Sequence, residues 1–142
     1  MISEGIGGAP RTRWAAAVAA VLTVAVGLGV RALLGGSVAE HAGDALYTVL
    51  ILALVVLVAP RLRPLTAAGA ALAFSWAVEL LQLTNVPAEL SRRSVVARLV
   101  LGSTFNAPDL LWYAVGAAAG WCGRRALAGR RARPAPASAA RS

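Results

Sequence analysis

The longest stretch of this chain without a charged side chain runs from Trp14 to Val30, and three further apolar runs follow it. A helix rises about 1.5 Å per residue, so about 20 residues are needed to cross roughly 30 Å of hydrocarbon. The runs lack the period-two alternation of strands, and lipid offers the backbone no water, so helices are expected. The predicted fold is an all-α integral membrane bundle of four transmembrane helices, with spans at about 14–34, 42–59, 65–83 and 107–123.

The composition excludes a soluble globule of this size. Hydrophobic residues make up 58% of the chain and charged residues 14%, whereas soluble domains average about 45–50% and about 25%. The net charge of +8 is also typical of nucleic-acid binders. However, the basic residues stand at the ends of the apolar runs, as membrane proteins carry them. We therefore expect the lipid bilayer, and no nucleic acid, as a partner.

The distribution of arginines predicts the orientation, because cytoplasmic loops carry the excess of basic residues. Four arginines, Arg31, Arg92, Arg93 and Arg98, fall on one side of the predicted bundle. The other ten fall on the opposite side, so we expect both termini in the cytoplasm. A cleaved signal peptide ending near residues 37–39 is the alternative for the first run, but Arg31 lies between the apolar stretch and that site.

Three segments outside the spans complete the predicted organisation. Residues 1–13 form a cytoplasmic N-terminal segment, and residues 124–142 form an Arg-rich cytoplasmic tail, which we expect to be disordered. Between the third and fourth spans, Leu99–Phe105 is apolar but too short to cross. A short re-entrant or interfacial segment is predicted there.

Ionisable residues within the spans are the most informative side chains, because a charge inside a bilayer is costly and is normally paired or functional. Glu79 falls roughly 21 Å across its helix, in the outer part of the membrane. Ser75 and Gln82 share its helical face, so this polar stripe is expected to face the bundle interior. Asp109 and Tyr113 form a similar stripe on the fourth span, followed by Gly116 and Gly120. Gly116-x-x-x-Gly120 is the small-residue pattern that lets membrane helices approach closely, and packing is its expected role.

The other spans contribute charge at the same end of the bundle. Asp44 opens the second span, and Arg31 closes the first. Together with the loop arginines these acids predict a charge-balanced polar cluster in the outer leaflet. Its candidate ligand-binding residues are Asp44, Glu79, Gln82, Arg92, Arg93, Arg98, Asp109 and Tyr113.

Several of these residues carry a resemblance to known families. Gly43-Asp44-Ala45-Leu46-Tyr47, Glu79-x-x-Gln82-Leu83 and Leu101-Gly102-x-x-Phe105-x-x-x-Asp109 resemble domain-of-unknown-function family 2809, over roughly residues 15–123. That resemblance implies a small multi-pass protein of the bacterial cytoplasmic (inner) membrane with no established activity. Glu79-x-x-Gln82 and Asp109 with Gly116 and Gly120 are also similar to the VanZ-like family of the cell envelope, although Tyr113 stands where that family has Asn.

The predicted function is the binding of an amphiphile with a charged head, such as an anionic envelope lipid or a lipid-linked wall precursor. The loop arginines would grip phosphate or carboxylate through their planar guanidinium groups. Two alternatives stay open: a membrane enzyme with Glu79 as general acid or base, and a structural or accessory subunit with a membrane-protein partner. No spacing of His, Cys, Asp or Glu points to a metal, and no cofactor motif is present.

Overall fold

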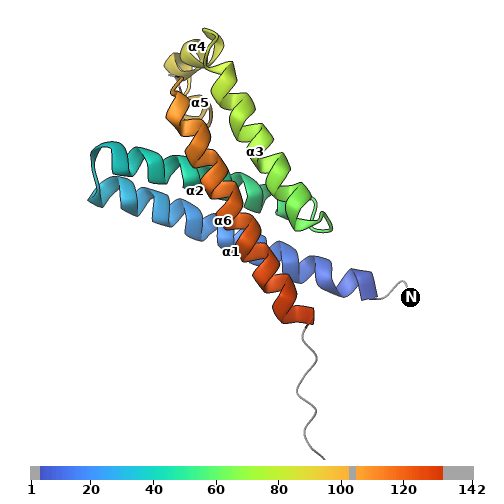
Figure 1. Ribbon diagram of the computed structural model, residues 1–142. Coiled ribbons are helices and arrows are strands. Elements are labelled where there is room, and N and C mark those ends of the chain that lie inside the picture. The colour runs from blue at the N-terminus through green and yellow to red at the C-terminus, as the bar shows by residue number, and fades with distance from the viewer. Residues whose placement is uncertain (1–3, 103–104, 133–142) are drawn as a thin grey trace, which may run out of the picture.

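The computed structural model describes residues 4–102 and 105–132, and these residues form six helices and no strand. Figure 1 shows their order along the chain. The helices are α1 (Glu4–Leu33), α2 (Gly36–Val58), α3 (Pro64–Leu81), α4 (Val86–Arg93), α5 (Val95–Leu101) and α6 (Ala107–Ala132).

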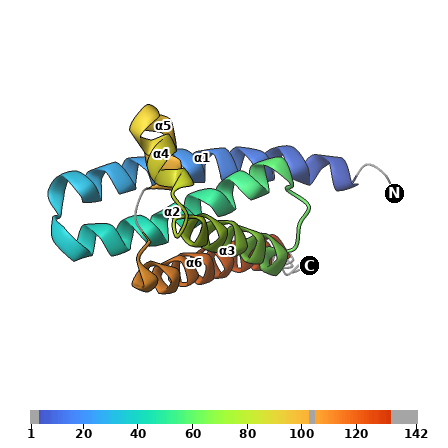
Figure 2. The ribbon, with the colours of Figure 1, turned by 90° about the horizontal axis from the view of Figure 1, so that it is seen from above.

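The four long helices form two antiparallel pairs that cross obliquely. α1 and α2 run side by side, as do α3 and α6, while α4 and α5 sit beyond the end of α3 (Figures 1 and 2). α2 is the central helix, because it packs against α1, α3 and α6. One end of the molecule holds the first turns of α1, the end of α2 and the short α2–α3 loop. Arg124 of α6 also lies there, because it contacts Pro60 of that loop. We call this the basic end, and the opposite end, which holds α4 and α5, the cap end.

Small residues allow the helices to approach closely. Ala67 and Ala71 on α3 are fully buried in a core cluster with Ala16, Leu52 and Val56. A Cβ atom at Gly116 would collide with the backbone carbonyl of Ala45, and one at Gly120 would collide with the Leu52 side chain. The pattern Gly116-x-x-x-Gly120 therefore packs α6 onto α2, as the sequence predicts.

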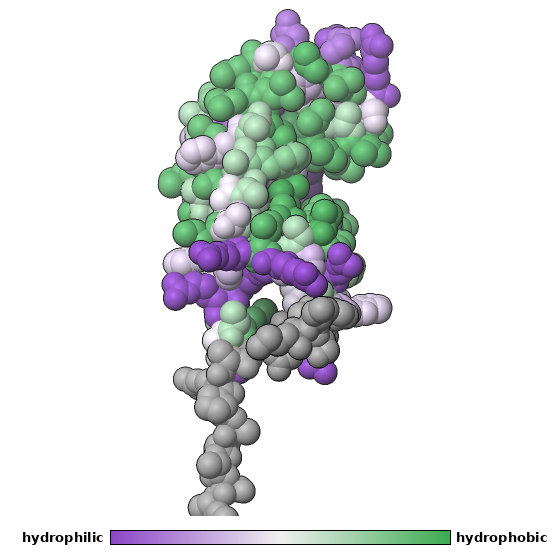
Figure 3. Space-filling model, turned by 90° about the vertical axis from the view of Figure 1, so that its right-hand side faces the viewer, coloured by the Kyte–Doolittle hydropathy of each residue, from purple (hydrophilic) through white to green (hydrophobic). Residues whose placement is uncertain are grey.

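Three helices are long and apolar enough to cross a membrane: Ala9–Leu33, Gly36–Val58 and Pro64–Leu81. Their large side chains are widely exposed, as at Val21, Leu28 and Leu65. An apolar surface of this extent indicates contact with lipid. Figure 3 shows a hydrophobic band bounded at both ends by hydrophilic residues. The predicted all-helical fold is confirmed over the described residues, and three of its helices are candidate membrane spans.

The predicted fourth crossing is not among these three helices. α6 is rich in Gly and Ala and ends in an arginine-rich turn, so its mean hydropathy is lower than that of α1 to α3. α6 also continues through the first part of the tail that we expected to be disordered, since residues 124–132 are helical. Eight of these nine residues are Ala, Leu or Arg, which are strong helix formers, and Gly129 is the exception. The rest of that predicted tail, 133–142, lies outside the described residues.

The helices also begin earlier than predicted at two places. α1 starts at Glu4, within the segment assigned to the cytoplasm, and α2 starts at Gly36 rather than near residue 42. Residues 1–3 lie outside the described part of the chain. Gly36 has a φ of 65°, a conformation that favours glycine. It lets the chain turn directly from α1 into α2.

The segment between α3 and α6 forms two short helices, α4 and α5, separated by Ser94. The Ser94 hydroxyl accepts a hydrogen bond from the backbone N–H of Ala97 and so caps α5. Apolar side chains on both helices are exposed, among them Val86, Val96 and Leu99. The predicted apolar segment Leu99–Phe105 is therefore divided between the end of α5 and the chain that leads to α6. Residues 103–104 of it lie outside the described residues.

Candidate functional site

Glu79, in the last turn of α3, is the most enclosed ionisable side chain of the cap end. It is 1% exposed. Its Oε1 accepts a hydrogen bond from the backbone N–H of Asn106 at 2.6 Å, and its Oε2 accepts one from the Tyr113 hydroxyl at 3.0 Å. Both oxygens are thus engaged, which offsets the cost of removing the carboxyl group from water. Glu79 ties the end of α3 to the start of α6.

A polar line runs along the buried face of α3 that leads to Glu79. Ser75, one turn earlier, is fully buried. Its hydroxyl accepts a hydrogen bond from the Thr48 hydroxyl of α2 at 2.9 Å and donates one to the Ala71 carbonyl at 3.0 Å. The prediction that Ser75 and Glu79 share an interior face is confirmed.

Gln82 makes its hydrogen bond with α5 at the cap end and not with Asn106 or Tyr113, the residues that bind Glu79. Its Nε2 donates to the backbone carbonyl of Leu101. The neighbouring Gly102 has a φ of 64°, and a Cβ atom there would lie 2.6 Å from that Nε2. A glycine at this position therefore leaves room for Gln82 to join α3 to the end of α5.

Asp44 and Asp109 form the less enclosed part of the cluster. Asp109 Oδ1 accepts a hydrogen bond from the side-chain Nδ2 of the exposed Asn106 at 2.8 Å. Asp44, in the third turn of α2, lies close enough to Asp109 and Glu79 to interact with both electrostatically. Its Oδ2 is buried and has no hydrogen-bond partner among the described residues. Three carboxyl groups from three helices therefore meet at the cap end.

The arginines predicted to balance these acids have other partners. Arg92 and Arg93 form ion pairs with Glu89 on the exposed face of α4, at 2.8 and 3.1 Å. These pairs follow from helical spacing, since residues three and four positions apart are neighbours on a helix. Arg98 donates to the backbone carbonyl of Ser91 at 3.1 Å. Arg31, at the end of α1, is exposed.

The cluster is therefore acidic at its centre, and the charge balance expected from the sequence is not found there. The loop arginines belong to the same end of the bundle as the acids, but the fold places them on the separate helices α4 and α5. The acidic groups lie where α2, α3 and α6 meet.

Tyr47, His41 and Trp112, which sequence reasoning did not assign to the site, make ring contacts on the helices that carry the acids. The rings of Tyr47 and Tyr113 lie 5.9 Å apart, and the Tyr47 hydroxyl donates to the Val100 carbonyl of α5 at 3.0 Å. His41 stacks on Trp112 with ring centroids 4.9 Å apart. The available signal was spacing, since Tyr47 lies three residues after Asp44 and Trp112 three residues after Asp109.

The described residues contain no group of three or more His, Cys, Asp or Glu side chains arranged to hold a metal ion. The chemistry of the cluster is that of hydrogen-bond acceptors. Glu79 has its acceptors filled, whereas Asp44 keeps one without a partner.

Comparison with known families decides the relationship of the chain. The sequence profile of a family described as "Protein of unknown function (DUF2809)" matches residues 33–117, more than half of the 142 residues. The chain belongs to the DUF2809 family. This confirms the family that the sequence motifs suggest. No curated protein and no solved structure matches the chain.

The DUF2809 match extends from the end of α1 to the middle of α6. It includes every acid of the cluster, the loop arginines of α4 and α5, and Tyr113. The arginine-rich end of α6 and most of α1 lie outside it. The site described above is thus contained in the part of the chain that defines the family.

Proposed function

We propose that this DUF2809 protein crosses the bacterial cytoplasmic membrane four times, with α6 as the fourth span and both termini in the cytoplasm. Support comes from the packing of α6 along α2 and α3, both of which have the length and hydropathy of spans. The Arg124 Nη2 of α6 also donates to the Pro60 carbonyl at 3.1 Å. α6 therefore ends at the same end of the molecule as α2.

The proposed function is the binding of an envelope lipid or lipid-linked precursor by its head group at the cap end. The observation that carries this proposal is the close pair of carboxyl groups of Asp44 and Asp109, in which the buried Oδ2 of Asp44 accepts no hydrogen bond from a donor in the described part of the chain. A buried acceptor without a partner costs about 1–3 kcal/mol, and a ligand that donates a hydrogen bond would recover this. Asp44 and Asp109 are thus the ligand-facing groups, whereas Glu79 holds the helices.

The acidic centre determines which part of such a ligand would enter. Carboxyl groups accept hydrogen bonds, so the matching head carries amine or hydroxyl donors, as aminolipids and glycosylated lipids do. A phosphate group of the same molecule would remain outside, where we expect the exposed arginines of α4 and α5 to contact it. Arg92, Arg93 and Arg98 keep the phosphate-binding role predicted from the sequence, at the rim of the site.

Native mass spectrometry of the protein extracted with its own lipids tests this proposal. We expect a defined lipid adduct on the wild type that falls at least about tenfold in Asp44→Asn and Asp109→Asn, since each change removes a carboxylate acceptor. Glu40→Gln is the matched control, because Glu40 is an exposed acid on the same helix as Asp44. Identical adducts in all four proteins would contradict the proposal.

A structural or accessory role is the second candidate, and the hydrogen bonds of Glu79 favour it. A carboxyl group with both oxygens engaged and 1% exposure acts as a clasp between α3 and α6. The same geometry disfavours Glu79 as a general acid or base, because such a group must reach the proton it transfers. If the clasp is the whole function, Glu79→Gln lowers the melting temperature, and Asp44→Asn and Asp109→Asn leave the lipid adducts unchanged.

A further inference from the structure

The short helix α5 contains no buried side chain, although each of the other five helices contains at least one. Four of its seven residues are large, apolar and exposed: Val95 at 66%, Val96 at 70%, Leu99 at 68% and Val100 at 43%. A helix of this length is not stable on its own in water. The side chains of α5 therefore need an apolar contact that the described chain does not provide.

The backbone at the end of α5 is satisfied by side chains of other helices. Three consecutive carbonyl groups, those of Val100, Leu101 and Gly102, accept hydrogen bonds from the Tyr47 hydroxyl of α2, the Gln82 amide of α3 and the Ser91 hydroxyl of α4, in that order. Where a helix ends in solvent, water can bind such carbonyl groups. Hydrocarbon contains no water, so the protein itself must supply the donors there. The end of α5 meets this requirement.

The one charged side chain of α5 bonds back to α4. Arg98 donates through Nη2 to the Ser91 carbonyl at 3.1 Å. The ion pairs of Glu89 with Arg92 and Arg93 lie on the exposed face of the same helix, α4. Long basic side chains reach in this way toward a polar layer while their own helix lies in an apolar one. Charge is thus gathered on α4, whereas α5 presents apolar side chains.

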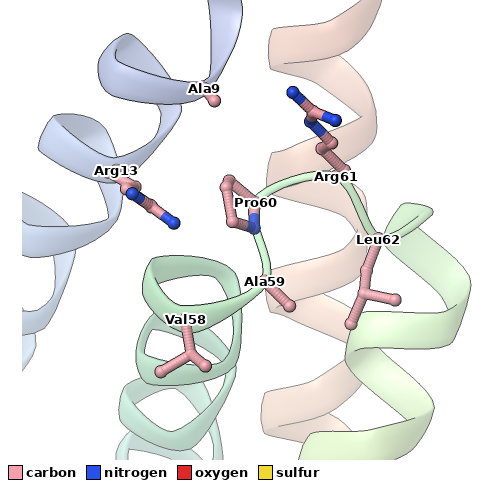
Figure 4. A pocket seen from close by; sticks show the side chains of 7 residues that line it. All are labelled: Ala9, Arg13, Val58, Ala59, Pro60, Arg61 and Leu62. Carbon is pink, nitrogen blue, oxygen red and sulfur yellow. The ribbon is translucent and has the colours of Figure 1, made fainter. Parts of the chain in front are cut away.

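The α2–α3 loop at the basic end has the opposite character. Figure 4 shows Arg13 of α1 and Arg61 of this loop on either side of Pro60. Charged side chains thus stand at the turn itself, as is usual for connections at a membrane surface. α5 differs from such a connection, because its exposed surface is formed mainly by valine and leucine.

We propose that α5 is immersed in the acyl chains of the leaflet at the cap end, while α4 lies in the head-group layer. Figure 1 shows α4 at the extreme of the cap end and α5 nearer the middle of the molecule. Val96 and Leu99 contact lipid tails, and the donors on α2, α3 and α4 hold the end of α5 at this depth.

Continuity with the surface of the spans identifies lipid as the partner of α5. Figure 3 shows hydrophilic residues at the extreme of the cap end, with the hydrophobic band immediately next to them. Apolar side chains at the edge of this band gain from the same hydrocarbon that covers the spans. The assignment depends neither on the head-group binding proposed for the acidic cluster nor on the side of the membrane that the cap end faces.

Spin labels on the full chain in phosphatidylcholine–phosphatidylglycerol liposomes test the immersion. Val96→Cys and Leu99→Cys are made in a Cys122→Ser background, and both positions are exposed, so folding does not depend on them. Oxygen concentrates in hydrocarbon, whereas a nickel–diamine complex stays in water. We expect both labels to collide more with oxygen than with nickel, like a label at Leu28→Cys on the exposed surface of α1. A label at Arg92→Cys on α4 should show the reverse order.

Two outcomes would overturn the immersion of α5. Nickel collisions at Val96→Cys and Leu99→Cys as frequent as at Arg92→Cys would place α5 in water. Labels reached by neither agent would show that protein covers α5, and magnetic broadening between labels would identify that protein as a second copy of the chain.

The hydrogen bonds at the end of α5 are tested with a label at Leu99→Cys. Gln82→Leu removes the donor to the Leu101 carbonyl, so we expect the label to shift toward nickel, because a free carbonyl is unfavourable in lipid. Thr84→Val is the matched control, since it removes an exposed hydrogen bond to the Leu81 carbonyl and should leave the label unchanged. Equal accessibility in Gln82→Leu and Thr84→Val would contradict the anchoring of α5 by these donors.

Discussion

Glu79 illustrates how a carboxyl group is held inside an apolar bundle. Its two oxygens accept hydrogen bonds from two groups near the start of α6, the backbone N–H of Asn106 just before the helix and the Tyr113 hydroxyl about two turns along it. Asp44 lies nearby with an unfilled acceptor. Two acids at one site therefore differ in role because one has all its partners within the protein and the other does not.

Replacing Glu79 by glutamine should destabilise the protein. The amide has only one acceptor oxygen, which can serve the Asn106 N–H, while the amide N–H group faces the Tyr113 hydroxyl. The hydroxyl must then accept instead of donate, and its own O–H loses its buried acceptor. We expect a loss of about 1–3 kcal/mol in the free energy of unfolding, measured by thermal unfolding in detergent. Glu89→Gln serves as the control, because its ion pairs are exposed and should contribute less than about 1 kcal/mol. Equal melting temperatures for Glu79→Gln and the wild type would contradict the clasp.

Among the helices, α6 packs through small residues rather than through large apolar side chains. Gly116 and Gly120 let it contact the backbone and side chains of α2 directly. The Trp76 indole of α3 donates to the Leu110 carbonyl of α6 at 2.9 Å, so a hydrogen bond also holds α6 against α3. The same residues that lower the hydropathy of α6 therefore make its packing close.

Gly116→Ala should separate α6 from α2. The added Cβ would meet the backbone of Ala45, which cannot rotate away as a side chain can. Overpacking of this kind costs about 1–3 kcal/mol, and the melting temperature in detergent should fall accordingly. Gly129→Ala on the same helix is the control, since nothing lies within 4 Å of its Cβ position and alanine favours helix. A variant Gly116→Ala as stable as Gly129→Ala would show that the close contact is absent in solution.

The whole molecule has two chemically distinct ends separated by an apolar band (Figure 3). The cap end gathers three acids from three helices, whereas the basic end gathers arginines from α1, the α2–α3 loop and α6. This asymmetry sets the expected orientation in the membrane.

Cysteine labelling in intact cells distinguishes three crossings from four. In a Cys122→Ser background, a cysteine at Ser37 or Ser94 should react with a membrane-impermeant maleimide from outside. A cysteine at Arg61 or Gly129 should react only after the membrane is permeabilised, because both positions belong to the basic end. Labelling of Gly129→Cys from outside, with Arg61→Cys protected, would show that α6 does not cross.

Much of the fold could be predicted from local sequence properties. Apolar runs of sufficient length become helices because an unpaired backbone is costly in lipid, and the periodic spacing of Ser75 and Glu79 places them on one buried face. The pattern Gly116-x-x-x-Gly120 likewise predicts close packing. These features depend on residues within a few turns of one another, so the sequence by itself determines them.

The composition of the site was decided only by the tertiary structure. Arg92 and Arg93 pair with Glu89 on their own helix, because neighbours on one turn need no further ordering of the chain to meet. Asp44, Glu79 and Asp109 come together only because α2, α3 and α6 pack as they do. Net charge at one end of a bundle can be counted from the sequence, but which charges touch depends on contacts between distant segments.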